Sequence, residues 1–467
     1  MSEVCCFYQW SEKKAQQLVS WVQAHDERYA IFLEESPSTV VLTTPHPRIR
    51  CISLPQQNPE KAFEKIAWEF LYLPFSFEDP THPVLQKLAA VQSEINFRAF
   101  DFADQGLQLL HNLRSHLSRP TSWAKDLYGK FKNIPAIVCG GGPSLASASS
   151  ELKRLQDRAV IIGCGAGVEA LLKMGIKPHF AAHVDPAPCH KFSSADIPVF
   201  YELRTDAAVV EKYKGKRFLV AGPGNFPLES WVQEKLGLES VLDGGWTVGT
   251  FGVVLATLLG CESIVLAGMD LATSKGQMYS PGVKTTSTTD HFIPLKNREG
   301  EPVLSRADWV KAAQWLDAFA LCHPDRKWGT ISRKGLEIPS IPLMDLQEFQ
   351  AAAVVTNRVQ HAVQEAFVHP APALWEEIVL SFKKSLEICR KILQEMERIF
   401  PQNPAENGLC AMLEHDLTLE PAFEQVLGPL WSYWLHVISR HNTAGEWGLY
   451  LNRILFFQSL CEKIDAI

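Results

Sequence analysis

The sequence lacks the short motifs that mark several common enzyme and metal-binding classes. HExxH, GxSxG and CxxC are all absent, which removes the support for a zinc metalloprotease, an α/β serine hydrolase and a zinc ribbon. The eleven cysteines are odd in number and form no paired spacing, so a disulfide framework is not indicated either. We therefore expect buried cysteines that act as small hydrophobic residues, Cys139 and Cys164 among them.

The chain also lacks an excess of basic residues. Forty-five Lys and Arg residues stand against 52 Asp and Glu residues, the net charge is -7, and no long block of one sign occurs. Nucleic-acid binding has no compositional support, and only a local basic groove stays open as an alternative.

Targeting and membrane signals are missing as well. The start, MSEVCCFYQWSEKK, lacks a basic segment followed by an apolar core, as a secretory signal would need. The densest apolar run, Thr250 to Gly260, is shorter than the ~20 residues that span a bilayer. We expect no membrane span and a soluble protein of a reducing compartment, the cytoplasm.

What the sequence does contain is enough apolar chain for several folded units. Its 467 residues are 46% apolar and 10% aromatic, and at ~100–200 residues per domain this length corresponds to two to four units. The pattern predicts an N-terminal α+β accessory domain over 1–130, an α/β domain over 131–345 and a C-terminal helical domain over 346–467.

Within the outer regions the elements are predicted from hydrophobic periodicity. In the N-terminal region we predict a helix over 12–23, a helical region over roughly 84–117, strands over 29–33 and 39–42, and otherwise a loop-rich stretch that includes PHPRIRCISLP. In the C-terminal region we predict helices over 422–439 and 446–464, with packed aromatics, and an earlier helix whose apolar stripe is Leu374, Ile378, Phe382, Leu386, Cys389, Leu393 and Met396.

The central region alternates short apolar runs with stretches that suit helices. Continuous hydrophobicity is typical of strands buried on both faces, and alternation with helices predicts a doubly wound parallel sheet, a Rossmann-like α/β fold. In such sheets, ligands bind beyond the carboxyl ends of the strands. The predicted strands cover 134–140, 158–164, 178–185, 197–203, 217–222 and 263–270.

A glycine-rich turn follows the first of these strands. Gly140, Gly141 and Gly142 allow close backbone approach, and Pro143 and Ser144 are placed to begin a helix whose amides can hold an anion. The turn is a candidate phosphate site. A tight strand-to-helix turn without a ligand is the alternative, because the motif is neither GxGxxG nor a P-loop.

The second strand ends in a further small-residue turn that contains Gly163 and Gly165. Together with Asp185 it resembles a dinucleotide fingerprint, but Val168 stands where the third glycine belongs. We keep both glycines as nucleotide-binding candidates and do not predict NAD binding.

Two acids end strands of the predicted sheet. Asp185, in HVDP, and Asp270, in GMDLA, could take a substrate proton, hold a sugar hydroxyl or ligate a metal, and each could instead cap a turn. His183 alternates with Asp185 and could share its sheet face, or it could simply be packed. We name all three as catalytic candidates and predict no metal-binding residues.

Further candidates follow later strands. Gly222, Gly224 and Asn225 form another glycine turn, and Thr247 stands where it could cap the helix over 247–259, whose start could also face a phosphate. The polar loop over 272–296 is interpreted as a lid or as disorder. His291 on that loop is a second candidate base.

The ordered combination of these segments resembles the motility accessory factor (Maf) family and the related 6-hydroxymethyl-dihydropterin pyrophosphokinases, together called MptE-like. The resemblance is carried by GPSL at Gly142 to Leu145, GIKP at Gly175 to Pro178, Asp185 with Pro186, and TVGTFGVVLATLLGCESIVLAGMDLA from Thr247 onward. It covers roughly residues 130–345.

This resemblance implies a sialyltransferase-like fold and a nucleotide-dependent transferase. The Maf branch implies transfer of a nonulosonic acid from a CMP-linked donor to a protein acceptor such as flagellin, with no cofactor. The pyrophosphokinase branch implies transfer of diphosphate from ATP with Mg²⁺, for which paired acids of the DLD kind are expected; here HVDP offers one acid and a histidine. A non-catalytic nucleotide-binding or scaffold protein stays open as a third class.

Overall fold

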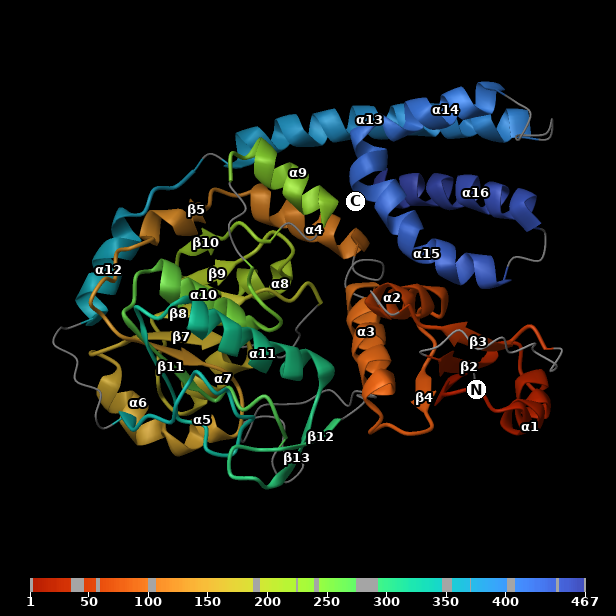
Figure 1. Ribbon diagram of the computed structural model, residues 1–467. Coiled ribbons are helices and arrows are strands. Elements are labelled where there is room, and N and C mark those ends of the chain that lie inside the picture. Colours follow the sequence, from red (N-terminus) through yellow and green to blue (C-terminus); the bar gives the residue numbers. More distant parts are fainter. Residues whose placement is uncertain are drawn as a thin grey trace. The chain divides into compact units, whose positions relative to one another are not determined.

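The computed structural model describes residues 3–34, 46–55, 59–99, 106–187, 194–223, 226–238, 243–273, 293–346, 355–369, 371–400, 408–441 and 445–465. The chain forms two compact units, shown as ribbons in Figure 1. The first comprises Met1–Asp104, Leu393–Leu413 and Leu427–Leu460, and the second comprises Gln105–Ile392, Glu414–Val426 and Cys461–Ile467. The three domain boundaries predicted from the sequence stay a prediction.

The first unit is built on a four-stranded parallel sheet in the order β3-β2-β1-β4. Ser11 caps α1 by accepting a hydrogen bond from the Lys14 amide, and α1 has the range predicted for it. The elements are β1 (Glu3–Tyr8), α1 (Glu12–Gln23), β2 (Arg28–Glu34), β3 (Ile49–Ser53), α2 (Pro59–Glu69), β4 (Phe75–Phe77) and α3 (Pro83–Ala99).

One expectation for this region was wrong, and another is confirmed over its described residues. The stretch predicted as loop contains β3, which is parallel to β2; pairing with a buried neighbour supplies the hydrogen bonds that a short sequence between prolines does not reveal. The helical region predicted over roughly 84–117 is confirmed by α3 and α4 (Gly106–Leu117). The strand predicted over 39–42 lies outside the described residues.

C-terminal helices complete the first unit. Trp431 lies 5.4 Å from Phe456 and 5.9 Å from Phe457 between ring centroids, which confirms that these aromatics pack together. Trp68 of α2 in turn contacts Tyr433. The helices here are the last part of α13 (Ala371–Ile399), the first part of α14 (Gly408–Thr418), α15 (Gly428–His441) and most of α16 (Gly445–Asp465).

The second unit contains an eight-stranded sheet in the order β14-β11-β6-β7-β8-β9-β10-β5, in which every neighbouring pair is parallel. This confirms the predicted α/β fold. The strands are β5 (Ser122–Trp123), β6 (Ala136–Cys139), β7 (Val160–Cys164), β8 (Phe180–His183), β9 (Val199–Tyr201), β10 (Arg217–Leu219), β11 (Ser263–Ala267) and β14 (Lys327–Thr330).

Helices and a small hairpin surround this sheet. The remaining elements are α5 (Ser144–Ser147), α6 (Ser149–Leu155), α7 (Ala166–Lys173), α8 (Ala207–Glu211), α9 (Pro227–Lys235), α10 (Val248–Leu258), β12 (Ile293–Lys296), β13 (Pro302–Ser305), α11 (Ala307–Cys322) and α12 (Val355–Glu365). The early part of α13 also belongs to this unit, and its predicted apolar stripe is confirmed by the burial of Ile378, Phe382 and Leu386.

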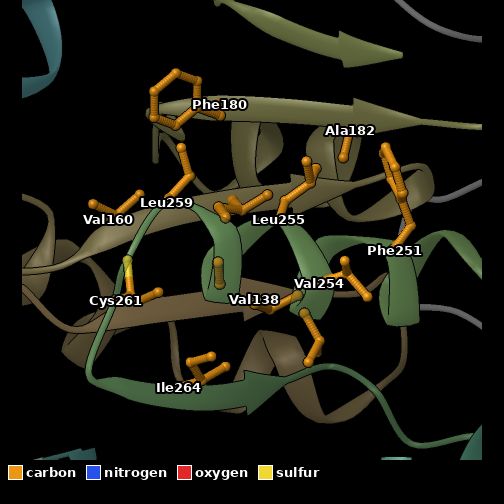
Figure 2. Close-up of a cluster of buried hydrophobic side chains, with 14 of the residues drawn as sticks. Val138, Val160, Phe180, Ala182, Phe251, Val254, Leu255, Leu259, Cys261 and Ile264 are labelled. Carbon is orange, nitrogen blue, oxygen red and sulfur yellow. The ribbon is translucent and has the colours of Figure 1, made fainter. Parts of the chain in front are cut away.

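Side chains from alternate strand positions enter two separate cores, one on each face of the sheet. Val138 packs with α10 and α11, whereas Ile137 packs with α6 and α7. Figure 2 shows the first core, in which α10 lies across the strands and buries Leu255 and Phe251 against them. Helices on both faces make the sheet doubly wound, as predicted.

No helix in the described parts of the chain is both long and apolar enough to cross a membrane.

Candidate functional site

The carboxyl edge of the eight-stranded sheet has a topological switch point between β6 and β11. From β6 the chain adds strands on one side as far as β10, and it then returns to place β11 on the other side of β6. The turns after these two strands meet: the Gly140 amide donates to Ala267 O at 2.8 Å and the Gly142 amide to Gly268 O at 2.7 Å. Ligands of open α/β sheets bind at such a point.

The glycines of the first turn are explained in part by this contact. A Cβ at Gly140 would lie 2.6 Å from Gly268 O, and a Cβ at Gly142 would lie 2.4 Å from Asp270 Oδ2. Only glycine fits where the two turns touch. Two of the three predicted phosphate-binding glycines therefore allow backbone-to-backbone packing, which is the alternative that the sequence left open.

Asp270 lies in the turn after β11, next to the start of α5, the helix that follows β6. Its Oδ2 accepts the Ser144 amide at 2.9 Å, its Oδ1 accepts the Ser332 hydroxyl, and the side chain is buried. The carboxylate thus occupies the position at the start of α5, after Pro143, where an anion would bind. These bonds suit a structural role for Asp270, and its catalytic role stays a prediction.

The turn after β7 brings a different helix start to the edge of the sheet. Gly165 has a φ of +51°, and a Cβ there would lie 3.0 Å from Cγ1 of Val248, the first residue of α10. Thr247 caps α10 as predicted, accepting from the Thr250 amide at 3.2 Å while the Thr250 hydroxyl accepts the Thr247 amide at 3.0 Å. The eleven-residue helix thus begins beside the β7 turn. Gly163 lies inside β7, close to Val168.

The two catalytic candidates at the end of β8, His183 and Asp185, lie in different environments. His183 is buried and its Nε2 lies 2.6 Å from the Tyr213 hydroxyl. Burial lowers the pKa of His183 to about 4, so the imidazole is neutral near pH 7. Asp185, two residues later, is exposed beyond the end of the strand. The strand ends before Asp185, so the alternation does not give the two side chains a common environment.

Two buried acids that were not predicted as site residues, Glu202 after β9 and Glu229 of α9, lie against the turn that follows β10. Glu202 follows β9 directly, is buried, and accepts from Arg204 Nε at 3.0 Å. A Cβ at Gly222 would lie 3.1 Å from Oε1 of Glu229, a buried acid of α9, and 3.5 Å from Oε2 of Glu202. The predicted glycine turn thus begins against two carboxylates. An acid directly after a buried strand, the signal used for Asp185, would also have found Glu202.

Several predicted positions lie outside the described residues. These are Gly224, Asn225, His291 and most of the loop over 272–296. Cys139 and Cys164 are buried as expected, and burial raises the pKa of the Cys164 thiol to about 12. Within the described ranges, no group of three or more His, Cys, Asp and Glu side chains is arranged to hold a metal ion.

Comparisons with known proteins bear on the family and the fold. Residues 107–276 match the family model described as 6-hydroxymethylpterin diphosphokinase MptE-like. The solved structure of a Maf glycosyltransferase from Magnetospirillum magneticum AMB-1 resembles this chain with a TM-score of 0.57 at 15% identity, over 100% of this chain and 79% of that one. No curated protein matches the sequence. The predicted resemblance to the Maf and MptE-like family is confirmed.

Proposed function

We propose that this protein is a glycosyltransferase that uses a nucleotide-activated sugar donor of the CMP-nonulosonate type. The observation that carries the proposal is the fold likeness to a Maf glycosyltransferase, which extends over the whole chain, whereas the MptE-like match covers residues 107–276. The fold likeness thus includes the accessory regions as well as the sheet. A protein acceptor and a cytoplasmic location are parts of the same proposal.

The donor phosphate is assigned to the start of α10. The first-turn amides of a helix carry partial positive charge and favour an anion. The start of α10 lies beside the positive-φ turn of Gly165 and next to Met269 after β11, since a Cβ at Gly249 would lie 2.8 Å from Met269 Cε. At α5 a charged carboxylate, that of Asp270, accepts a first-turn amide, whereas at α10 a neutral hydroxyl, that of Thr247, does so. The phosphate site therefore shifts from the first glycine turn to the second.

Asp185 is assigned to the acceptor. Its exposed carboxylate at the carboxyl edge can accept the proton of an attacking hydroxyl, so that the hydroxyl oxygen forms the new glycosidic bond as the nucleotide leaves. His183 is neutral and bonded to Tyr213. Its lowered pKa makes it a weak base and its side chain is buried, so we assign His183 to supporting the end of β8 rather than to taking the acceptor proton.

Transfer of diphosphate from ATP is the second candidate, favoured by the match to the MptE-like diphosphokinase family. Such a reaction needs Mg²⁺ held by oxygen ligands. Asp185 could supply one. Asp270 could supply another, although each of its carboxylate oxygens already accepts a hydrogen bond, from Ser144 or from Ser332.

Isothermal titration calorimetry separates these functions. The protein is titrated with CMP, a CMP-linked nonulosonate, UDP, ATP and GTP, each with and without Mg²⁺. We expect metal-independent binding of the cytidine ligands. Magnesium-dependent binding of ATP alone would instead establish the second candidate, and no binding by the folded protein would favour a scaffold.

The place of the phosphate is tested with a matched pair at the first position of α10. Val248→Glu puts a carboxylate where the phosphate should lie, yet suits the helix, because acids are favourable in a first turn. We expect it to weaken nucleotide binding about tenfold by charge repulsion. Val248→Gln has the same length without the charge and should bind nearly as the parent does; equal weakening by both would place the phosphate elsewhere.

A further inference from the structure

A pocket lies among helices of the second unit. It is enclosed by α4, α9, the early part of α13 and the end of α16, with a cavity volume of about 200 Å³. Figure 1 shows α4 and α9 running side by side next to the start of α13. We call it the Trp231 pocket, after a residue of α9 in its wall.

The wall of the Trp231 pocket is apolar and aromatic. Trp231, Trp375 and Phe382 line it together with Leu113 and Ile378, and the Trp231 and Phe382 rings lie 6.2 Å apart. An apolar cavity of roughly 150 Å³ lined by Leu, Ile and Phe stays dry and binds benzene. The Trp231 pocket is larger than that, so an apolar group of a ligand fits in it, whereas a whole protein helix, about 10 Å across, does not.

The lining of the pocket is elongated along α13. Six lining residues come from α13 alone, and they recur at spacings of three and four, so that they form one stripe along the helix. From the first to the last they cover three turns, a length of roughly 16 Å. This shape suits a linear chain better than a compact ring system. The six are Trp375, Ile378, Val379, Phe382, Lys383 and Leu386.

Cations stand at the mouth of the pocket. Arg114 and Lys383 line it and are exposed, and Lys235 lies 5.9 Å from the centroid of the Trp231 ring. Neither lysine has an ion pair with another described residue. The acid of the lining, Asp465, is bonded to Arg390. In a chain of net charge -7, this positive rim beside an apolar wall is complementary to an anionic head on an apolar tail.

We propose that the Trp231 pocket binds a single-chain anionic amphiphile, of which a long-chain carboxylate is the simplest member. The chain lies along the stripe of α13 among the aromatic rings, and the head group meets Lys383 and Arg114. The site is separate from the nucleotide site and does not depend on the proposed transferase activity.

Calorimetry with dodecanoate, below its micelle concentration, tests the proposal on the full chain. We expect saturable binding at one site per chain, and weak or no binding of dodecyltrimethylammonium, which has the same tail and the opposite charge. Failure of dodecanoate to bind to folded protein overturns the proposal. Equal binding of the two amphiphiles overturns the part assigned to the cationic rim.

Two matched pairs of variants on α13 locate the ligand. Val379→Phe fills the pocket and should weaken dodecanoate binding about tenfold or more, whereas Leu380→Phe adds the same ring to a neighbouring residue outside the pocket. Lys383→Glu should weaken binding about fivefold, whereas Lys384→Glu makes the same charge change away from the lining. Circular dichroism confirms that each variant is folded. If the members of each pair behave alike, the ligand does not occupy this pocket.

Discussion

The ends of β11 and β8 carry the same sequence signal and have different environments. Each strand is a buried apolar run, and an aspartate follows it, Asp270 in one case and Asp185 in the other. Asp270 is buried and joins Ser144 to Ser332 at the junction of β6 and β11. Asp185 is exposed. The turns after β6 and β14, the two neighbours of β11, supply Ser144 and Ser332 to Asp270 and make it part of the frame, whereas the side chain of Asp185 stays exposed at the end of β8.

The largest expected effect is on catalysis at the end of β8. Asp185→Asn removes the proposed base and keeps its shape, so we expect kcat/KM for sugar transfer to fall about 10²- to 10⁴-fold. The exposed side chain should contribute less than about 0.5 kcal/mol to stability. Transfer from the nucleotide-sugar donor is followed by product analysis, with thermal unfolding as the control. Full activity in the variant would remove Asp185 from the mechanism.

At the junction of β6 and β11, the largest expected effect is on stability, because the packing there is tight. Gly142→Ala places a Cβ 2.4 Å from Asp270 Oδ2 and 2.6 Å from Gly268 O. Overpacking between two backbones should lower the free energy of unfolding by about 3 kcal/mol. Gly408→Ala is the matched control, because a Cβ there meets nothing within 4 Å. Urea unfolding measures both; similar stability in the two variants would show that the β6–β11 contact is looser than described.

The pH dependence of the free energy of unfolding tests whether His183, unlike the exposed Asp185, is buried and neutral. Burial lowers the pKa of His183 from 6.5 to about 4, so the unfolded chain takes up the proton first as the pH falls. The free energy of unfolding should therefore drop between pH 6.5 and pH 4, by about 2 kcal/mol from pH 7 to pH 5 for this residue.

His183→Gln keeps a partner for Tyr213 without the titration and should lose that share of the pH dependence. The buried His116 and His179 also have pKa values lowered to about 4, but both proteins contain them, so their contribution cancels. Parallel curves for the parent and the variant would contradict the buried, neutral state of His183.

The smallest expected effect is on the free energy of unfolding, when the same Asp→Asn substitution is made at each of the two strand ends. Asp270→Asn removes a charge that Ser144 and Ser332 contact, and should lower the free energy of unfolding by about 1 kcal/mol. Asp185→Asn should leave it nearly unchanged. A larger loss at Asp185 than at Asp270, measured by urea unfolding, would reverse the roles given to the two strand ends.

Much of the fold was predictable because it depends on local patterns. Runs such as the one ending at Cys164 are buried on both faces and therefore apolar throughout, and α1 begins at a serine cap that the sequence displays. β3 and β5 were not predicted because both strands are short. Their hydrogen bonds come from neighbouring strands whose positions the sequence does not give. β5 has two residues and pairs with β10.

The candidate site was less predictable, because its features depend on which turns meet. Gly140 and Gly142 read as a phosphate turn until β11 is placed beside β6. Thr247 was expected to cap a helix and does, since capping depends on four consecutive residues, here Thr247 to Thr250. That the same helix begins beside Gly165 follows only from the packing of α10 on the sheet.

By itself, the sequence determined the doubly wound sheet, the family resemblance and the set of strand-end residues, because hydrophobic periodicity and turn chemistry are local properties of the chain. Only the tertiary structure decided which of those residues face the solvent and which bond to each other. Strand order brings together turns that are more than a hundred residues apart, and burial then fixes whether an acid such as Asp270 completes the frame or, like Asp185, stays accessible to a ligand.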